Sequence, residues 1–150
     1  MTAIDADQLA KAKSSAMASL AMREHSVLEL QQKLARKNYT AAVIDQVVTE
    51  LQQQNFLSNE RFAEVYWRQR AEKGFGPVKI SLELQQKGLE EAIIEHGLVA
   101  AEVDFEALIQ RVYQKKYHNK PCRDLKDKAR RQGFLFRRGF PADAIRSVLD

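Results

Sequence analysis

The stretch LARKNYTAAVIDQVV, residues 34–48, recurs as LQQKGLEEAIIEHGL at residues 84–98 and as LFRRGFPADAIRSVL at residues 135–149. The three copies share apolar residues at four positions, namely Leu34, Tyr39, Ile44 and Val48, then Leu84, Leu89, Ile94 and Leu98, then Leu135, Phe140, Ile145 and Leu149. A period of about 50 residues is typical of stacked repeats, in which neighbouring units complete each other's core. A modular binding protein is therefore a better first hypothesis than an enzyme with a single pocket.

The composition favours helices. The chain of 150 residues is rich in Ala, Leu, Gln, Glu, Lys and Arg and holds only 6 Gly and 3 Pro, and strand-like alternation is scarce. We predict an all-α fold of three tandem three-helix repeats that form an elongated, curved array. The predicted units are residues 1–56, which include an N-terminal helix, residues 57–102, and residues 103–150, which form a basic third repeat.

Capping residues divide the first unit into helices. The spacing of apolar residues predicts a helix from about Asp7 to Met22. Ser26 followed by Glu29 forms a capping box that starts a second helix, and Thr40 starts a third.

The second unit repeats this order. Ser58 begins a helix that runs through Lys73, with Phe62, Val65, Tyr66 and Gln69 on one face and Trp67 as a core residue beside them. Gly74-Phe75-Gly76 breaks this helix, and Pro77 opens the next one. The middle helices end at Asn38, Gly88 and Gly139, three residues that tolerate the positive φ of a helix terminus.

Basic residues gather near the C-terminus. The segment from Arg111 to Arg138 holds eleven basic and two acidic residues, a net charge of +9, whereas the rest of the chain carries −5. Such asymmetry is typical of a contact with a polyanion or an acidic partner, although a solvated helix face is the simpler alternative. Our candidate contact residues are Arg61, Arg68, Arg70, Lys73, Lys115, Lys116, Arg123, Lys126, Arg130, Arg131, Arg137 and Arg138.

The third unit departs from the repeat at one core position. Arg131 stands where the first two units have Leu30 and Ile80. We expect residues that break the repeat, Arg131 among them, to mark the functional surface.

No set of residues indicates catalysis. The chain lacks a P-loop, and His25, His96 and His118 do not show the i, i+4 spacing of a helical zinc pair. We therefore expect a protein that is not an enzyme and that holds no cofactor and no metal. The single cysteine, Cys122, suits a reducing compartment, and neither a signal peptide nor a membrane span is evident. We expect a cytoplasmic monomer.

Four short motifs resemble one known family. They are Arg23-Glu24-His25-Ser26 followed by Glu29-Leu30, then Arg61-Phe62-Ala63, Gly74-Phe75-Gly76 and Arg137-Arg138-Gly139-Phe140. In this order the chain resembles the RecX regulatory proteins, which modulate the RecA recombinase, from about Leu20 to Leu149. The resemblance implies binding to the RecA–DNA filament and inhibition of RecA ATP hydrolysis, strand exchange and filament extension. It thereby implies a role in recombination, DNA repair and the SOS response, and it supplies no agreed set of functional residues.

A second hypothesis is a DNA-binding helical module that acts without RecA, with its small three-helix units used as helix-turn-helix readers. No unit shows a recognition helix with an evident set of Asn, Gln and Arg side chains on one face. Both hypotheses leave open whether the chain contacts single- or double-stranded DNA directly.

Overall fold

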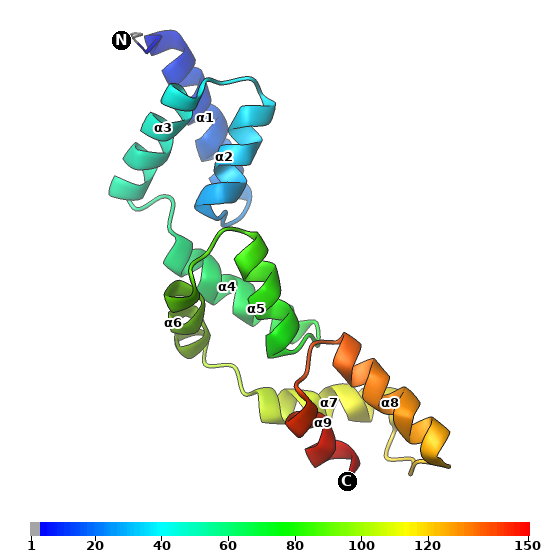
Figure 1. Cartoon of the computed structure of the whole chain (residues 1–150). Helices are drawn as coiled ribbons and strands as arrows, with labels where there is room; N and C mark the ends of the chain where they lie inside the picture. Colours follow the sequence, from blue (N-terminus) through cyan, green and yellow to red (C-terminus); the bar gives the residue numbers. More distant parts are fainter. Residues whose placement is uncertain (1–3) are drawn as a thin grey trace.

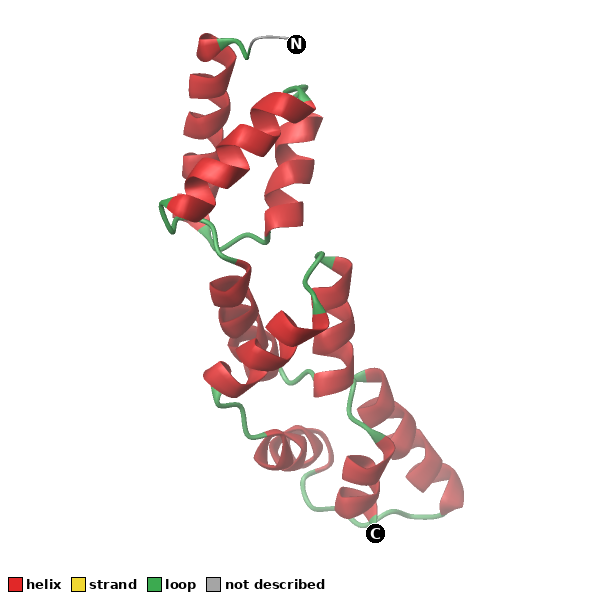
Figure 2. Cartoon of the chain, turned by 60° about the vertical axis from the view of Figure 1, so that its left-hand side comes forward, coloured by secondary structure: helices red, strands yellow, loops and turns green. Residues whose placement is uncertain are grey.

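The computed structural model describes residues 4–150, and in them it contains helices and loops but no strand (Figures 1 and 2). The helices are α1 (Ala6–Met22), α2 (Val27–Arg36), α3 (Ala41–Gln53), α4 (Asn59–Glu72), α5 (Pro77–Gln86), α6 (Glu91–Ala101), α7 (Phe105–Tyr117), α8 (Leu125–Arg137) and α9 (Ala142–Leu149). The prediction of an all-α fold is confirmed. No helix in residues 4–150 is both long and apolar enough to cross a membrane.

The helices pack in three successive groups of three. Contacts join α1, α2 and α3 to one another, and likewise α4, α5 and α6, whereas α9 packs on both α7 and α8. The groups follow one another along a long, bent body, with α1 toward one end and α7, α8 and α9 toward the other (Figure 1). The predicted elongated array of three-helix repeats is confirmed.

The sequence repeat corresponds to one capping motif at the end of each middle helix. In the second unit, the N–H of Leu89 donates to the carbonyl of Leu84 and the N–H of Gly88 donates to that of Gln85. These two bonds define the Schellman motif, in which the apolar residue after the turn packs on the last helical turn. The same pair of bonds ends α2 and α8. The shared Leu and Tyr, Leu or Phe positions are therefore the two apolar members of this cap.

The residue between them adopts a left-handed conformation in all three units. Asn38 has φ 68°, Gly88 has φ 84° and Gly139 has φ 98°. The prediction for these positions is confirmed. The predicted capping box is also present, because Ser26 accepts from the N–H of Glu29 and the Glu29 carboxylate accepts from the N–H of Ser26.

Within residues 4–150 the buried side chains form two cores rather than three. The first unit has its own core, which includes Leu30, Ile44 and Val47. A second core runs without interruption from Trp67 in the second unit to Leu135 in the third. The second and third units are therefore fused by apolar packing, whereas the first unit joins them mainly through polar contacts.

The buried face of helix α4 is turned from the one that its spacing predicts, since Phe62 is buried as predicted but Ala63 and Ala71 are buried as well. Trp67 is only 2% exposed, as expected for a core residue, and its indole N–H donates to the carbonyl of Ile94 at 2.9 Å. Gln69, however, is exposed. The reason lies in α6, where Gly97 lets the helix approach so closely that an added Cβ would lie 2.6 Å from the Cβ of Ala63. The helix turns its Ala63 side to α6, and this moves Gln69 into solvent.

Candidate functional site

The first joint, where the first unit meets the second, is built around the start of α2. The N–H of Val27 donates to the Oδ1 of Asn59 at 2.9 Å. Gly88 at the end of α5 lies against Leu28, and a Cβ on this glycine would approach the Leu28 Cβ to 2.8 Å. The N-terminus of one middle helix thus meets the C-terminus of the next.

The second joint, where the second unit meets the third, repeats this arrangement between α5 and α8. The N–H of Gly76 donates to the carbonyl of Arg138 at 2.7 Å, and that of Val78 donates to Gly139 at 2.9 Å. A Cβ on Gly76 would lie 2.5 Å from the Gly139 oxygen, so only glycine fits there. The motifs noted in the sequence fall mainly at these two joints, where they serve the assembly of the array.

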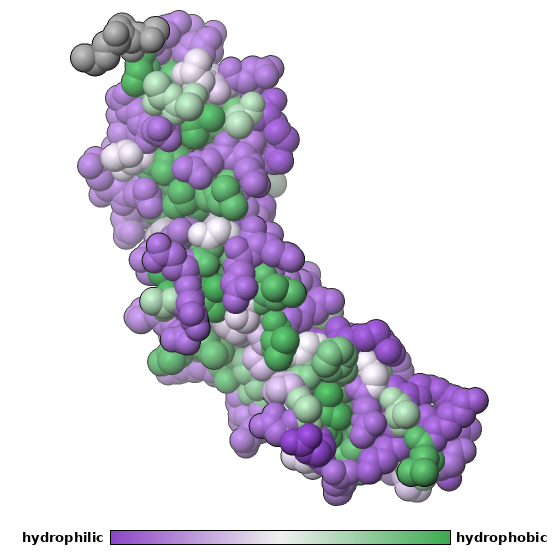
Figure 3. Space-filling model, in the orientation of Figure 1, coloured by the Kyte–Doolittle hydropathy of each residue, from purple (hydrophilic) through white to green (hydrophobic). Residues whose placement is uncertain are grey.

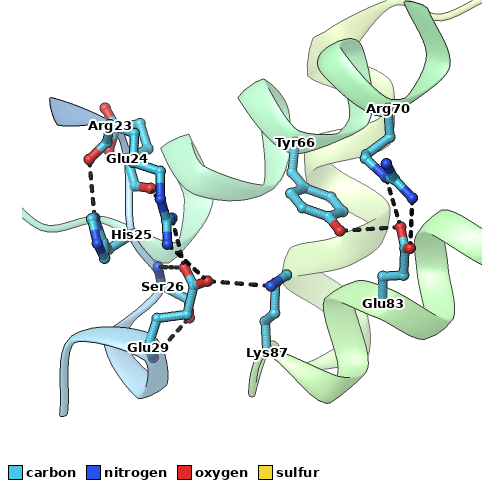
Figure 4. Close-up of polar contacts among 9 residues, drawn as sticks. All are labelled: Arg23, Glu24, His25, Ser26, Glu29, Tyr66, Arg70, Glu83 and Lys87. Atoms are coloured by element: carbon cyan, nitrogen blue, oxygen red, sulfur yellow. Dashed lines mark hydrogen bonds and ion pairs between the residues drawn. The ribbon is translucent and has the colours of Figure 1, made fainter. Parts of the chain in front are cut away.

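Among the predicted contact residues, Arg61 and Arg70 are held by acidic partners that lie on other helices or connectors of the chain. The Nε of Arg61 donates to Glu24 at 2.5 Å, and its other nitrogens reach the carbonyls of Asn55 and Phe56. Arg70 donates twice to the Glu83 carboxylate, at 2.9 and 2.8 Å (Figure 4). Arg61 closes the first joint and Arg70 ties α4 to α5, so both are less available to a partner than the sequence suggested.

Glu29 is the centre of the polar contacts at the first joint (Figure 4). It accepts from Arg23 at 3.2 Å, from the Ser26 N–H at 3.0 Å and from Lys87 of α5 at 3.2 Å. Burial raises the pKa of the Glu29 carboxyl, but these hydrogen bonds outweigh it and hold the pKa below its ordinary value. The joint is therefore held by an ionised carboxylate that bridges two units.

Arg131 has a structural role. It is 4% exposed and lies 3.1 Å from Asp127, and it donates to the Tyr113 hydroxyl and to the Lys120 carbonyl, each at 2.7 Å. The guanidinium replaces the aliphatic side chain of the other units because the long connector before α8 offers carbonyl groups to bind. The expectation that this departure from the repeat marks an exposed contact residue is not supported by its burial.

A groove at the second joint brings four of the predicted contact residues together. Its volume is about 460 Å³, and it lies where α4, α7 and α8 meet. Its cationic side chains come from Lys73, Arg111, Lys115, Lys116 and Arg138. Its apolar lining comes from Leu108, Val112 and Phe134, and Glu72 is its one acidic lining residue in residues 4–150. We call this site the basic groove.

Aromatic rings hold two of these cations in place. The Lys116 Nζ lies 3.9 Å from the centre of the Phe134 ring. The Arg138 guanidinium lies 5.5 Å from the same ring and 5.1 Å from the Phe75 ring, and it donates to the carbonyl of Lys73 at 3.1 Å. Such cation–π contacts position a charge without neutralising it. The basic groove can therefore bind phosphate or carboxylate groups beside an apolar surface.

The other predicted residues lie elsewhere. Arg123 and Arg130 flank Asp127, each at 3.6 Å, and Arg68 pairs with Glu64 at 3.1 Å. Lys126 and Arg137 are exposed on α8 outside the groove. Arg111 belongs to the basic segment of the sequence but is not among the predicted contact residues, and neither is Phe134. The spacing of Arg111 and Lys115, one helical turn, was the signal that could have placed both on one face.

Apolar clefts recur between the middle and last helices of the second and third units. One is lined by Leu82, Ile94 and Leu98, and the other by Phe136 and Ile145. Leu82 and Phe136 are 53% and 70% exposed. In Figure 3 apolar atoms emerge between hydrophilic ones over these two units. The two clefts occupy equivalent positions of the repeat.

Comparisons with known proteins agree with this architecture. Models of the first, second and third three-helix domains of RecX match residues 12–51, 58–98 and 102–149. The regulatory protein RecX of Halorhodospira halophila is 38% identical over 136 residues, which cover 91% of this chain and 84% of that protein. The RecX of Pseudomonas savastanoi pv. phaseolicola is 35% identical over 137 residues, which cover 91% and 88%.

Solved structures show the same fold. The crystal structure of RecX from Lactobacillus salivarius superimposes with a TM-score of 0.77 at 21% identity, over 97% of this chain and 96% of that one. A second crystal structure, of a regulatory protein RecX, gives a TM-score of 0.78 at 21% identity, over 98% and 78%. With three matching domains in tandem and close relatives over nine tenths of its length, this chain belongs to the RecX family of regulatory proteins.

Proposed function

We propose that this chain regulates the RecA recombinase by binding the RecA–DNA filament. In this proposal it inhibits ATP hydrolysis, strand exchange and filament extension, and so modulates recombination, DNA repair and the SOS response. Membership of the RecX family supports the regulatory role. The proposal further holds that the chain acts by binding alone, without catalysis of its own.

The basic groove is the observation that carries the mode of contact. It places five cationic side chains beside an apolar lining at the bend between the second and third units. A filament of protein on DNA offers phosphates and acidic side chains along its length, and a repeat protein offers a long surface to lie against it. The proposed inhibition follows if the bound array bridges neighbouring RecA subunits and restrains their movement.

The test measures ATP hydrolysis by RecA on single-stranded DNA as this chain is added. We expect hydrolysis to fall as the chain approaches a stoichiometric ratio to RecA. The variant Lys115→Glu/Lys116→Glu reverses two exposed charges of the groove. It should need at least a tenfold higher concentration than the parent to reach the same inhibition of ATP hydrolysis. The control Lys11→Glu/Lys37→Glu makes the same change of net charge on exposed residues of the first unit and should inhibit as the parent does. Unchanged hydrolysis with the parent chain would refute the proposed function, and equal inhibition by both variants would refute the role of the groove.

The hypothesis of a DNA-binding module that acts without RecA is separated by binding to naked DNA. Phosphate-driven binding to duplex DNA weakens with salt, with a log–log slope near −0.9 per phosphate contacted. Binding that keeps a strong preference for one sequence at high salt, together with no effect on RecA, would favour the alternative.

A further inference from the structure

His25 is a buried titratable group at the first joint that the proposed function does not use. Its side chain is 2% exposed, and its Nδ1 lies 3.0 Å from the carbonyl oxygen of Arg23. Since a carbonyl oxygen only accepts, the hydrogen of the neutral ring is on Nδ1. The Nε2 then presents a bare lone pair, and this buried atom has no hydrogen-bond partner in residues 4–150.

The repeat shows that the position does not need an imidazole for packing. Fifty residues on, the equivalent position is Phe75, a partly buried ring between the second and third units. The rings of Phe75 and His25 follow the first helix of their unit and precede the cap of the middle helix. The fold therefore accepts an aromatic ring without nitrogen here, and the unpaired Nε2 of His25 costs free energy that phenylalanine would not.

The surroundings oppose a positive charge on His25. Burial is the main cause that lowers the pKa of His25 below the ordinary histidine value of 6.5, and the charges of Arg23 and Lys33 lower it further. The hydrogen bond to the Arg23 carbonyl and the charge of Glu29 raise the pKa but do not outweigh these effects. The carboxylates nearby are already engaged, since Glu24 binds Arg61 of α4, and Glu29 binds both Arg23 and Lys87 of α5. Glu83, the other carboxylate that lines the cavity beside the ring, binds Arg70.

A polar cavity lies next to the ring and gives it room to rotate. The cavity has a volume of about 490 Å³ and is lined by His25 together with residues of α2, α4 and α5, among them Gln32, Tyr66 and Gln86. A protonated ring that rotates into this space can donate from Nε2 to water. Such a rotation displaces the ring from its buried place in the connector before α2, next to Ser26 and to the Glu29 carboxylate that bridges the two units.

We propose that His25 makes the first joint sensitive to protons, so that acidification loosens the first unit from the other two while the second joint, with phenylalanine at the equivalent position, stays closed. The proton binds at Nε2, the one ring nitrogen with a free lone pair. Because the folded chain holds this group neutral, the contribution to stability is fully present above the ordinary value of 6.5 and is lost as the pH falls below it.

The experiment measures distances across each joint in the full chain with pairs of spin labels. In a background with Cys122→Ser, labels at Ala10→Cys and Gln85→Cys span the first joint, and labels at Gln85→Cys and Gln110→Cys span the second; all three sites are exposed. We expect the first distance distribution to broaden between about pH 7.5 and about pH 5.5, and the second to stay constant.

Two variants assign the response to one residue. His25→Phe, which copies the second unit, should remove the change across the first joint. His96→Gln/His118→Gln, which alters the two exposed histidines, should keep it. A response that persists in His25→Phe, or a parent chain with no response, would overturn the proposal.

A measurement on the unmodified chain keeps the proposal testable if a variant does not fold. Nitrogen chemical shifts of the His25 imidazole report its tautomer and its titration. We expect His25 to carry its hydrogen on Nδ1 at neutral pH and to titrate below the ordinary histidine value of 6.5. A midpoint for His25 at or above 6.5 would contradict the proposal.

Discussion

Ile94→Ala tests the core that joins the second and third units. Ile94 is 3% exposed, and its carbonyl accepts the indole N–H of Trp67, the only tryptophan of the chain. The change removes three carbon groups, worth about 2.4 kcal/mol at ~0.8 kcal/mol each. The cavity left behind adds about 24 cal/mol per Å³ that does not collapse. We therefore expect the free energy of unfolding to fall by about 3 kcal/mol, within the usual range of ~2–5 kcal/mol for such deletions.

Urea unfolding followed by Trp67 fluorescence measures this loss directly, because the indole lies in the same core. Val99→Ala is the matched control, since Val99 follows on the same helix but is 76% exposed, and its loss should stay within about 0.5 kcal/mol. A loss below about 0.5 kcal/mol for Ile94→Ala would refute the register of the second repeat.

The equivalent change in the first unit separates the two cores. Ile44 is 7% exposed and belongs to the core of the first unit alone. Ile44→Ala should therefore make the first unit unfold at a lower urea concentration, seen as an earlier loss of part of the far-ultraviolet circular dichroism signal. The transition followed by Trp67 fluorescence should stay nearly unchanged. If it shifts the Trp67 transition as far as Ile94→Ala does, the two cores unfold as one, and the polar first joint is stronger than its contacts suggest.

Three further predictions concern caps, pH and charge. Gly139→Ala should lower the free energy of unfolding, measured with heat or urea, by more than about 1 kcal/mol, because φ is +98° and the new Cβ would clash with Lys79 of α5. Gly133→Ala, inside α8, should leave the free energy of unfolding unchanged or raise it by up to about 1 kcal/mol. Burial, followed by the charge of a neighbouring glutamate, raises the pKa of Tyr66 from 10.0 to about 12, so stability should fall as the pH rises through that interval, and Tyr66→Phe should remove this part of the alkaline loss in unfolding curves. Arg130→Glu/Arg137→Glu should weaken binding to DNA or to the RecA–DNA filament while circular dichroism stays unchanged, and binding equal to that of the parent would assign these two charges to solubility.

The fold could be predicted from the sequence because one local motif occurs three times. Leu84, Gly88 and Leu89 are close in the chain, and the bonds that they make depend on backbone geometry that the residue types favour. The same holds for Ser26 with Glu29, which cap α2 within one turn. Local chemistry of this kind is visible in a sequence without knowledge of tertiary contacts.

The site could be predicted only in part, because charge counts do not show what a charge is paired with. Arg61, Arg70 and Arg131 look like their exposed neighbours in the sequence, yet each is held by a carboxylate of this chain. Glu24 lies 37 residues before Arg61, and only the packing of the two units brings them together. The basic groove likewise depends on how α4, α7 and α8 meet.

The division into two cores could not be read from the repeat. The spacing treats the three units alike, whereas a continuous apolar core spans the second joint and ion pairs bridge the first. The difference depends on single residues that the pattern does not include, such as Glu29 at the first joint and Phe75 at the second.

The position of the basic segment at one end of a long molecule gives the chain a strong electric dipole. Residues 111–138, with a net charge of +9, form the end of α7 and all of α8, while the remaining residues carry −5. In the field of a polyanion such a molecule turns its basic third unit toward the polyanion before any contact is made. The charge asymmetry therefore selects the orientation of the first encounter and raises its rate at low ionic strength, independently of the affinity that the final contacts provide.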